Sequence, residues 1–514
     1  MADIHGRLQK IKELVDAGDY FVINRARQYG KTTTLWALKE YLKETYLVVF
    51  INFQQLSEND YRDEYAFASA FADVFLDAYN KNEVSASIEE SLSFLQKVAD
   101  GETENIGLRR LFKALSQICV GVSGKIVLLI DEVDSASNNQ VFLDFLAQLR
   151  AYYLSGDRKS TFWSVILAGV YDIRNLKLKM HPDLQHKYNS PWNIAAEFNV
   201  DMSLKVSDIA GMLEEYEGDH CTGMNVSQMA ELIYDYTSGY PFLVSRLCKL
   251  LDENIAGKER ISDKTSAWTK NGLAEAVKLL LAEPNTLFDD MVKKIYDLPE
   301  LRKMLYAILF QGDRISYNID NHAIRVGSMF GFVKNINGNT AIANRIFETR
   351  LYNLFLSEEM LNSAIYKAAD VEKNLFVSGG QLNMELILER FVQSFTDIYS
   401  DAEESFLEEN GRRFFLLYLK PIINGVGNYY IESRTRDLRR TDIIIDYHGK
   451  QYVCEMKIWH GEEYNRRGEK QLLGYLEDYH LTTGYMVSFN FNKNKKPGIR
   501  KIRIGEKELI EAVV

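Results

Sequence analysis

The chain has 514 residues, of which 46% are hydrophobic and 26% are charged. This balance is typical of folded proteins and excludes disorder as the main state, and at roughly 150 residues per domain the length suggests about three domains. The 61 Lys and Arg residues against 72 Asp and Glu residues give a net charge of −11. A uniformly basic, histone-like nucleic-acid binder is therefore excluded, and contact with nucleic acid must come from local basic patches.

The four cysteines are too few and too scattered for a disulfide framework, and none forms a CxxC pair. The N-terminal stretch has no apolar segment typical of a secretory signal, and the longest apolar runs fall far short of the roughly 20 residues of a membrane span. These features predict a cytoplasmic protein that makes no contact with a membrane.

Residues 1 to 255 alternate short apolar runs with amphipathic segments of helical spacing. The apolar runs predict strands at 20–24, 47–53, 126–130, 163–167 and 194–200. Strands that alternate with helices indicate a parallel sheet covered by helices. We therefore expect an α/β domain over residues 1–255.

A Gly-Lys-Thr triplet follows the first predicted strand and opens a helical pattern, in the run Asn-Arg-Ala-Arg-Gln-Tyr-Gly-Lys-Thr at 24–32. Amides at a helix start bind phosphates, a lysine reaches the β- and γ-phosphates, and a hydroxyl is a ligand for Mg²⁺. The run departs from G-x-x-x-x-G-K-[ST] at the first glycine, where Arg25 stands instead. A helix cap that happens to carry a lysine is the alternative. The residues expected to bind ATP in this loop are Arg27, Gly30, Lys31, Thr32 and Thr33.

The apolar run at 126–130 ends in Asp131 and Glu132. We expect Asp131 to hold Mg²⁺ together with Thr32, and Glu132 to polarise the water that attacks the nucleotide. This second element beside the Gly-Lys-Thr triplet favours a P-loop ATPase over coincidence.

A Gly-Tyr-Pro break at 239–241 opens an amphipathic helix that carries Arg246. We expect Arg246 to lie near the start of that helix, where its side chain reaches the nucleotide phosphates. A solvated helix arginine is the alternative.

The middle of the chain, 256–368, predicts helices at 298–310 and 321–330 and a hairpin over 333–342 with its turn at Asn337-Gly338. Helices followed by a small hairpin suggest a winged-helix-like domain. The remaining residues, 369–514, begin with predicted helices at 381–400 and 406–419 and continue as strands around a turn at 448–449. They suggest a mixed α/β domain of nuclease size.

The turn at 448–449 sets the register of the two strands beside it. It places Asp442 opposite Glu455, and since side chains alternate along a strand, Lys457 shares their face. Paired carboxylates suit Mg²⁺ or Mn²⁺, and Lys457 would orient a water or stabilise charge on a phosphodiester oxygen. An exposed hairpin face that carries ordinary charges is the alternative.

These motifs resemble the bacterial AAA-ATPase-like proteins that carry a C-terminal PD-(D/E)XK nuclease domain. The resemblance rests on the run at 24–32, on Asp131-Glu132 and on the Gly-Tyr-Pro at 239–241, and it covers nearly the whole chain. The family commonly has Arg-Pro-Arg at the loop, so an arginine at position 25 is similar to the family and Ala26 is a divergence. The resemblance implies a winged-helix middle and a restriction-endonuclease-like C-terminal domain.

The family also has a glutamine-containing helix after the cluster, and Gln471 with Tyr475 four residues later is similar to it. The helix before the cluster is expected to add an acidic residue. Glu409 is favoured over its neighbour Glu408, and complementing the helix dipole is the alternative role for either.

The motifs together predict a protein that binds and hydrolyses ATP and is coupled to a metal-dependent nuclease, with DNA favoured over RNA as substrate. The alternative is a nucleotide-driven switch whose C-terminal domain binds nucleic acid or a partner without cutting. The sequence leaves open whether the chain forms a homo-oligomer. Basic side chains are expected to neutralise the phosphate backbone, or else to form an ordinary solvated surface. They are Arg434, Arg436, Arg439, Arg440, Lys493, Lys495, Lys496, Arg500, Lys501 and Arg503.

Overall fold

A computed structural model describes residues 3–79, 88–103, 106–155, 160–170, 192–255, 264–311, 313–360, 362–399, 408–424, 427–432, 442–448, 450–459, 469, 472–474, 476, 481–490 and 495–514. The contacts divide the chain into two compact units. The first unit consists of Met1–Glu215, Tyr240–Phe242 and Met329–Gly331, and the second of Tyr216–Gly239, Leu243–Ser328 and Phe332–Val514. The predicted domain limits near residues 255 and 368 stay predictions.

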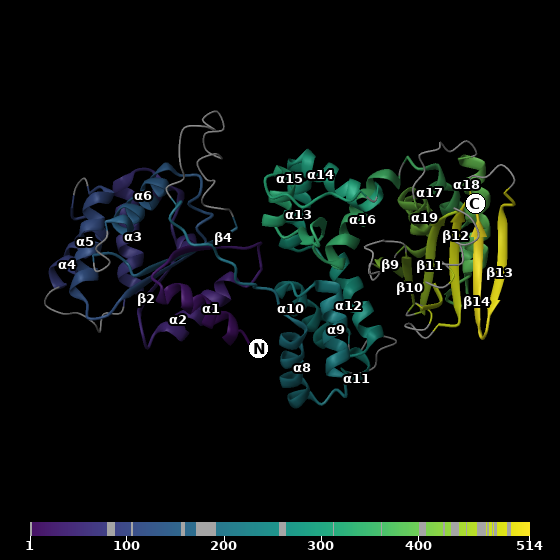
Figure 1. The fold of residues 1–514 in the computed structure, drawn as a ribbon, viewed down its shortest axis with the longest axis horizontal. Helices are drawn as coiled ribbons and strands as arrows, with labels where there is room; N and C mark the ends of the chain where they lie inside the picture. The colour runs from purple at the N-terminus through teal and green to yellow at the C-terminus, as the bar shows by residue number, and fades with distance from the viewer. Residues whose placement is uncertain are drawn as a thin grey trace. The chain divides into compact units, whose positions relative to one another are not determined.

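A four-stranded parallel sheet with the order β1-β4-β3-β2 forms the centre of the first unit (Figure 1). Its strands are β1 (Tyr20–Asn24), β2 (Leu47–Asn52), β3 (Ile126–Asp131) and β4 (Ser164–Gly169). One face packs against α1 (His5–Asp16) and α2 (Lys31–Leu42). The other face packs against α3 (Glu64–Ala78), α4 (Glu89–Ala99), α5 (Leu108–Gly121) and α6 (Gln140–Leu154), with the short turns η1 (Phe53–Gln55) and η2 (Glu58–Tyr61) after β2.

Alternation along the strands builds both apolar layers of the first unit. Phe21 and Ile23 point to the α1 side, whereas Tyr20 and Val22 point to the α3 side. Strands covered on both faces read as continuous apolar runs, which is why the sequence predicts them and the parallel sheet is confirmed.

The predicted fifth strand at 194–200 is wrong. The segment makes one isolated parallel bridge, between Phe21 and Ala196, and then leaves the sheet. The carbonyls of Phe198 and Val200 accept hydrogen bonds from the side chain of Arg25 rather than from a neighbouring strand. An apolar run here reflects burial against the sheet rather than membership of it.

The second unit begins within α8 (Val206–His220) and is helical over its first part. It contains the hairpin of β5 (Val333–Ile336) and β6 (Asn339–Ile342), whose turn residues Asn337 and Gly338 both have positive φ, as expected for a two-residue turn. The predicted helix at 298–310 is divided into an α-helix over 299–306 and a π-helical segment over 307–311. The helical elements are α9 (Val226–Thr237), α10 (Pro241–Leu250), η6 (Leu251–Ile255), α11 (Lys264–Ala267), α12 (Lys270–Ala282), α13 (Thr286–Asp297), α14 (Pro299–Tyr306), η7 (Ala307–Gln311), α15 (His322–Met329) and α16 (Arg345–Met360).

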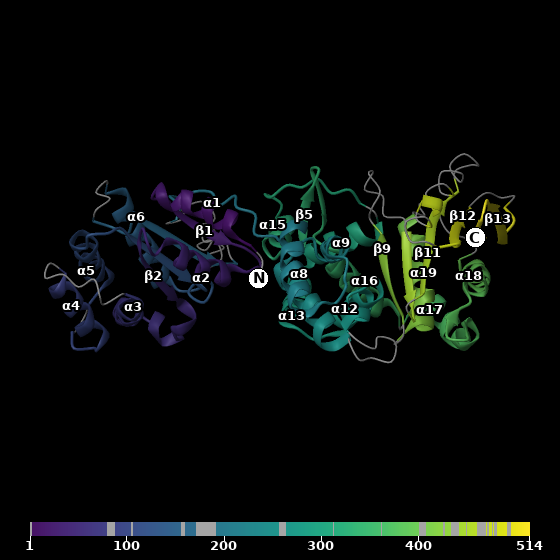
Figure 2. The same ribbon diagram turned by 90° about the horizontal axis from the view of Figure 1, so that it is seen from below.

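A six-stranded mixed sheet with the order β13-β14-β12-β11-β10-β9 ends the chain. Its strands are β9 (Gly427–Glu432), β10 (Asp442–Tyr447), β11 (Lys450–Ile458), β12 (Thr483–Phe489), β13 (Gly498–Ile504) and β14 (Lys507–Val513). In Figure 2, α17 (Ala364–Glu372), α18 (Met384–Ile398) and α19 (Glu408–Ile423) lie on one side of this sheet. The turn η8 (Lys373–Phe376) and the short pair β7 (Val377–Ser378) and β8 (Gln381–Leu382) join α17 to α18.

The two faces of this sheet have different cores. Phe489 packs against the rings of Phe391 and Phe395 on the side of α18. On the opposite side, Leu472 and Leu476 lie in an apolar cluster with Ile444, Val453, Met486 and Leu509. Across the part of the chain that the structure describes, no helix has the length and apolar character needed to cross a membrane.

Candidate functional site

The loop between β1 and α2 has the backbone shape of an anion site. Gly30 stands at the N-cap of α2 with a φ of 78°, a left-handed conformation that glycine adopts at low cost, and Gln28 has a φ of 55°. Gly30 supplies no side chain to cap α2, so the first amides of this helix are available to an anionic ligand.

Lys31 lies inside this loop. Its Nζ donates hydrogen bonds of 3.0 Å to the carbonyls of Arg25 and Ala26, and the side chain is buried. Burial lowers the pKa of Lys31, and the nearby carboxylates, with Asp134 foremost, oppose that shift. The ammonium is therefore already placed within the loop, where a phosphate would meet it.

The end of β3 places a carboxylate beside the start of α2. The hydroxyl of Thr32 donates to Oδ2 of Asp131 at 2.6 Å, and Asp131 is fully buried. Oδ1 of Asp131 accepts the backbone N–H of Glu132 at 2.9 Å. A hydroxyl and a carboxylate are the hard oxygen ligands that Mg²⁺ prefers, so Thr32 and Asp131 fit the metal that the sequence predicts.

Glu132 follows in a left-handed conformation, with a φ of 55°. Burial raises the pKa of its carboxyl, the neighbouring charge of Asp131 adds to the rise, and the charge of Lys31 opposes it. A raised pKa makes a carboxylate a better proton acceptor near neutral pH, so Glu132 is chemically suited to the predicted role of general base.

Arg25, where the sequence departs from the glycine of the loop pattern, anchors the loop. Its guanidinium donates to the carbonyl of Val200 at 2.9 Å and to that of Phe198 at 3.4 Å, and lies 5.2 Å from the centre of the Phe198 ring. Burial lowers the pKa of Arg25. A side chain held in this way fixes the loop against the 198–200 segment.

Sequence reasoning missed two residues of this site. Asp134 accepts the backbone N–H of Val170 at 2.6 Å, which ties the end of β3 to the end of β4. The hydroxyl of Tyr240 donates to the carbonyl of Arg27 at 2.5 Å, and its ring packs edge-on against Tyr29. The acidic run after β3 signals Asp134, whereas nothing local in the sequence signals the partner of Tyr240.

The other residues assigned to ATP lie in different surroundings. Arg27 and Thr33 are exposed on the loop and on the first turn of α2. Arg246 lies in the middle of α10 and not near its start, because the helix begins at Pro241. Its guanidinium forms an ion pair of 2.9 Å with Glu283 within the second unit. Contact between Arg246 and a nucleotide stays a prediction.

The second predicted site lies on the C-terminal sheet. Asp442 stands opposite Glu455 in the β10–β11 register, as the turn position predicts, and His448 at the turn has a φ of 52°. Nζ of Lys457 lies 2.8 Å from Oε1 of Glu455, and both side chains are buried. Burying two charges is costly unless they are paired, so Glu455 and Lys457 must pair in order to be buried in the sheet, whether or not they form a functional site.

Several residues assigned to this site lie outside the described part of the chain. They are Gln471, Tyr475, the side chains of Asp442, Glu408 and Glu409, and the basic residues Arg434, Arg436, Arg439, Arg440 and Lys493. Over the residues that are described, no group of three or more His, Cys, Asp or Glu side chains is arranged to hold a metal. The structure thus brings together Glu455 and Lys457, and the backbone register adds Asp442.

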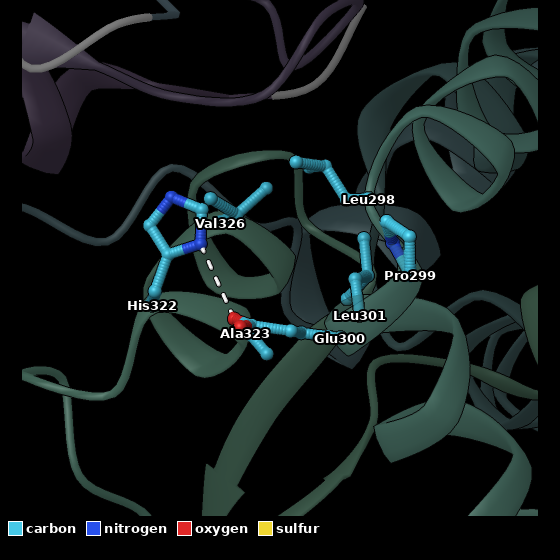
Figure 3. Close-up of a pocket in the computed structure, with 7 residues that line it drawn as sticks. All are labelled: Leu298, Pro299, Glu300, Leu301, His322, Ala323 and Val326. Atoms are coloured by element: carbon cyan, nitrogen blue, oxygen red, sulfur yellow. Dashed lines mark ion pairs between the residues drawn. The ribbon is translucent and has the colours of Figure 1, made fainter. Parts of the chain in front are cut away.

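A cavity of about 360 Å³ lies elsewhere in the second unit, at the starts of α14 and α15 (Figure 3). Its lining is mainly apolar, with one ion pair between Nδ1 of His322 and Oε2 of Glu300 at 3.8 Å. It contains none of the predicted site residues.

No family model and no curated protein matches the chain. Among solved structures, a Walker-type ATPase of Pyrococcus abyssi is similar at a TM-score of 0.47 and 14% identity, covering 68% of this chain and 96% of that one. The ORC2 protein of Aeropyrum pernix is similar at a TM-score of 0.41 and 14% identity, covering 71% of this chain and 96% of that one. Because these likenesses are weak, the assignments that follow rest on the geometry of the chain itself.

Proposed function

We propose that the first unit binds ATP with Mg²⁺ and hydrolyses it. The observation that carries the proposal is the hydrogen bond between Thr32 and Asp131, which joins the start of α2 to the end of β3 beside the buried Lys31. A helix cap that merely carries a lysine would not require a buried carboxylate at the same place.

Each residue has a separate task in this proposal. The first amides of α2 bind phosphate oxygens, and Lys31 exchanges the carbonyls of Arg25 and Ala26 for the β- and γ-phosphates. Thr32 and Asp131 would hold Mg²⁺, which neutralises charge on the phosphates. Glu132 accepts the proton of the attacking water, and its raised pKa suits that task.

Replacing Lys31 tests the nucleotide site. Lys31→Met keeps the apolar stem and removes the ammonium, and we expect ATP affinity to fall at least about tenfold because charge-assisted hydrogen bonds are lost. Lys43→Met, at the exposed far end of α2, is the matched control. Titration calorimetry with ATP and Mg²⁺ measures both, and equal affinity in the two variants would contradict the proposal.

A second function, metal-dependent cleavage of nucleic acid, is favoured by the C-terminal sheet. The register of Asp442 with Glu455 and the ion pair of Glu455 with Lys457 support it. In this proposal the two carboxylates would hold Mg²⁺ or Mn²⁺, and Lys457 would stabilise charge on the phosphodiester. DNA is the expected substrate, and binding without cleavage is the alternative.

Plasmid cleavage with Mg²⁺ or Mn²⁺ separates these two possibilities. We expect Lys457→Ala to abolish nicking, while Lys450→Ala, an exposed lysine on the same strand, leaves it unchanged. Calorimetry with Mn²⁺ adds a readout that does not depend on activity, because Glu455→Gln should lose the metal site. Equal nicking by wild type and Lys457→Ala would end the assignment as a nuclease.

A further inference from the structure

A row of residues crosses the C-terminal sheet on the face that carries Glu455. Glu455 stands opposite Met486, Met486 opposite Glu511, and Glu511 opposite Arg500. Residues directly opposite one another on neighbouring strands share a face, so Arg500 on the edge strand β13 faces the same side as the proposed nuclease site.

Glu511 holds Arg500 in place. Glu511 is fully buried, and its carboxylate accepts the hydroxyl of Ser488 at 2.5 Å and the Nε of Arg500. A buried carboxylate is costly unless it is paired, so the pairing with Arg500 is strongly favoured. Arg500 is therefore oriented before any ligand arrives.

About half of the Arg500 side chain is accessible. The side chain of Arg500 is 48% exposed, whereas that of Glu511 is 0% exposed. The planar guanidinium carries five N–H donors, and the contact with Glu511 through Nε leaves the terminal nitrogens to bind a second anion. The Trp459 ring, 6.0 Å from the guanidinium carbon, flanks it.

Arg500 differs from the other basic residues of β13 in the face of the sheet that it occupies and in the carboxylate with which it pairs. Lys501 and Arg503 alternate with it and point to the opposite face, where Lys501 forms an ion pair of 2.7 Å with Glu385 on α18. The basic residues near the C-terminus are thus not one patch, and only Arg500 among these three faces the side of Glu455.

We propose that Arg500 binds a backbone phosphate of a nucleic acid strand, a few nucleotides away from the phosphate that would be cut. Three intervals between neighbouring strands separate Arg500 from Glu455, and at roughly 4.8 Å each they amount to about 14 Å. That distance is the axial rise of about four nucleotides. The contact therefore positions the substrate and leaves the scissile phosphate to Lys457, and in this sense it rests on the proposed nuclease function.

Binding of a fluorescent 20-base-pair DNA duplex, measured by anisotropy over a series of salt concentrations, tests the proposal. Ca²⁺ replaces Mg²⁺ so that the duplex stays intact. We expect Arg500→Gln to weaken binding at least about fivefold and to reduce the salt slope by about one ion. Arg503→Gln is the matched control, with the same charge change on the same strand and the opposite face, and should leave both values near wild type.

Arg500→Gln removes the partner of a buried carboxylate, so its folding is checked by thermal melting. If it does not fold, Arg500→Lys decides, because lysine keeps the charge beside Glu511 but cannot bridge two anions with a planar fork. We expect Arg500→Lys to weaken binding at least about threefold. Wild-type affinity in Arg500→Lys, equal losses in Arg500→Gln and Arg503→Gln, or no binding by the wild type would each overturn the proposal.

A small substrate separates this proposal from the nuclease function itself. Bis(p-nitrophenyl) phosphate has no flanking phosphate, so Arg500→Gln should cleave it at the wild-type rate while it cleaves plasmid with a raised KM. A loss on both substrates would mean that the active site is disturbed and would overturn a positioning role. If the wild type cuts neither substrate yet Arg500→Gln still weakens duplex binding, the nuclease function fails and the phosphate contact stands.

Discussion

Arg25 and Arg27 lie two residues apart in the loop between β1 and α2 and are expected to respond differently to the same substitution. Arg25 is anchored to the carbonyls of Val200 and Phe198, whereas Arg27 is exposed. Arg25→Met and Arg27→Met remove the same charge and keep similar volume. The first should lower the stability of the unit, and the second should lower its affinity for ATP.

The magnitudes follow from the contacts. A hydrogen bond to a charged group contributes about 1.5–3 kcal/mol, and the contact of the Arg25 guanidinium with the Phe198 ring adds about 0.5–1 kcal/mol. Desolvation of the guanidinium offsets part of this sum, so Arg25→Met should cost about 2–3 kcal/mol. For a unit of this size that corresponds to a fall in Tm of roughly 4–12 °C.

Arg27→Met should change the free energy of unfolding by less than about 0.5 kcal/mol, as exposed substitutions do. Its ATP affinity should fall about tenfold, because the cation that is expected beside the phosphates is lost. Calorimetric melting and ATP titration of both variants measure the two effects. Equal losses of Tm in the two variants, or an unchanged Tm in Arg25→Met, would refute the structural role given to Arg25.

Further outcomes follow from single contacts. Because burial raises the pKa of Glu132, the rate of ATP hydrolysis should rise with pH through that raised pKa, by up to about tenfold per pH unit below it. Glu132→Gln should bind ATP but hydrolyse it at least about a hundredfold more slowly. A single-turnover rate that does not change from pH 4.5 upwards would contradict the role of Glu132 as general base. Tyr240→Phe loses the hydrogen bond to the carbonyl of Arg27 and should lower the free energy of unfolding by about 0.5–1.5 kcal/mol in urea titrations. A change below about 0.3 kcal/mol would mean that this hydrogen bond does not stabilise the fold. Gly411→Ala would place a Cβ 2.2 Å from the ring of Phe489 and should cost about 1–3 kcal/mol, whereas Gly124→Ala meets nothing within 4 Å; similar melting of the two would contradict the packing described.

Local patterns in the sequence predict much of this fold. The Asn337-Gly338 turn and the turn at His448 each fix a hairpin, and a two-residue turn sets the register of every pair beyond it. For that reason Asp442 could be placed opposite Glu455 from the sequence alone. The parallel strands of the first unit are predicted because they are buried on both faces.

Partners that lie far apart along the chain could not be predicted in this way. Arg25 binds carbonyls more than 170 residues away, and Tyr240 donates to a carbonyl 213 residues away. Glu511 and Ser488 meet on strands whose order in the sheet no local pattern reveals. In each case the pairing follows from how the elements assemble, and the sequence carries only the types of the side chains.

The bridge between Phe21 and Ala196 also bears on how molecules of this protein meet one another. β1 is an edge strand of its sheet, and an edge strand exposes backbone N–H and C=O groups that another chain can pair with. Here the N–H of Ala196 donates to the carbonyl of Tyr20 at 2.8 Å, so part of that edge is already occupied from within the molecule. A second molecule that added a strand at this edge would first have to displace that bond.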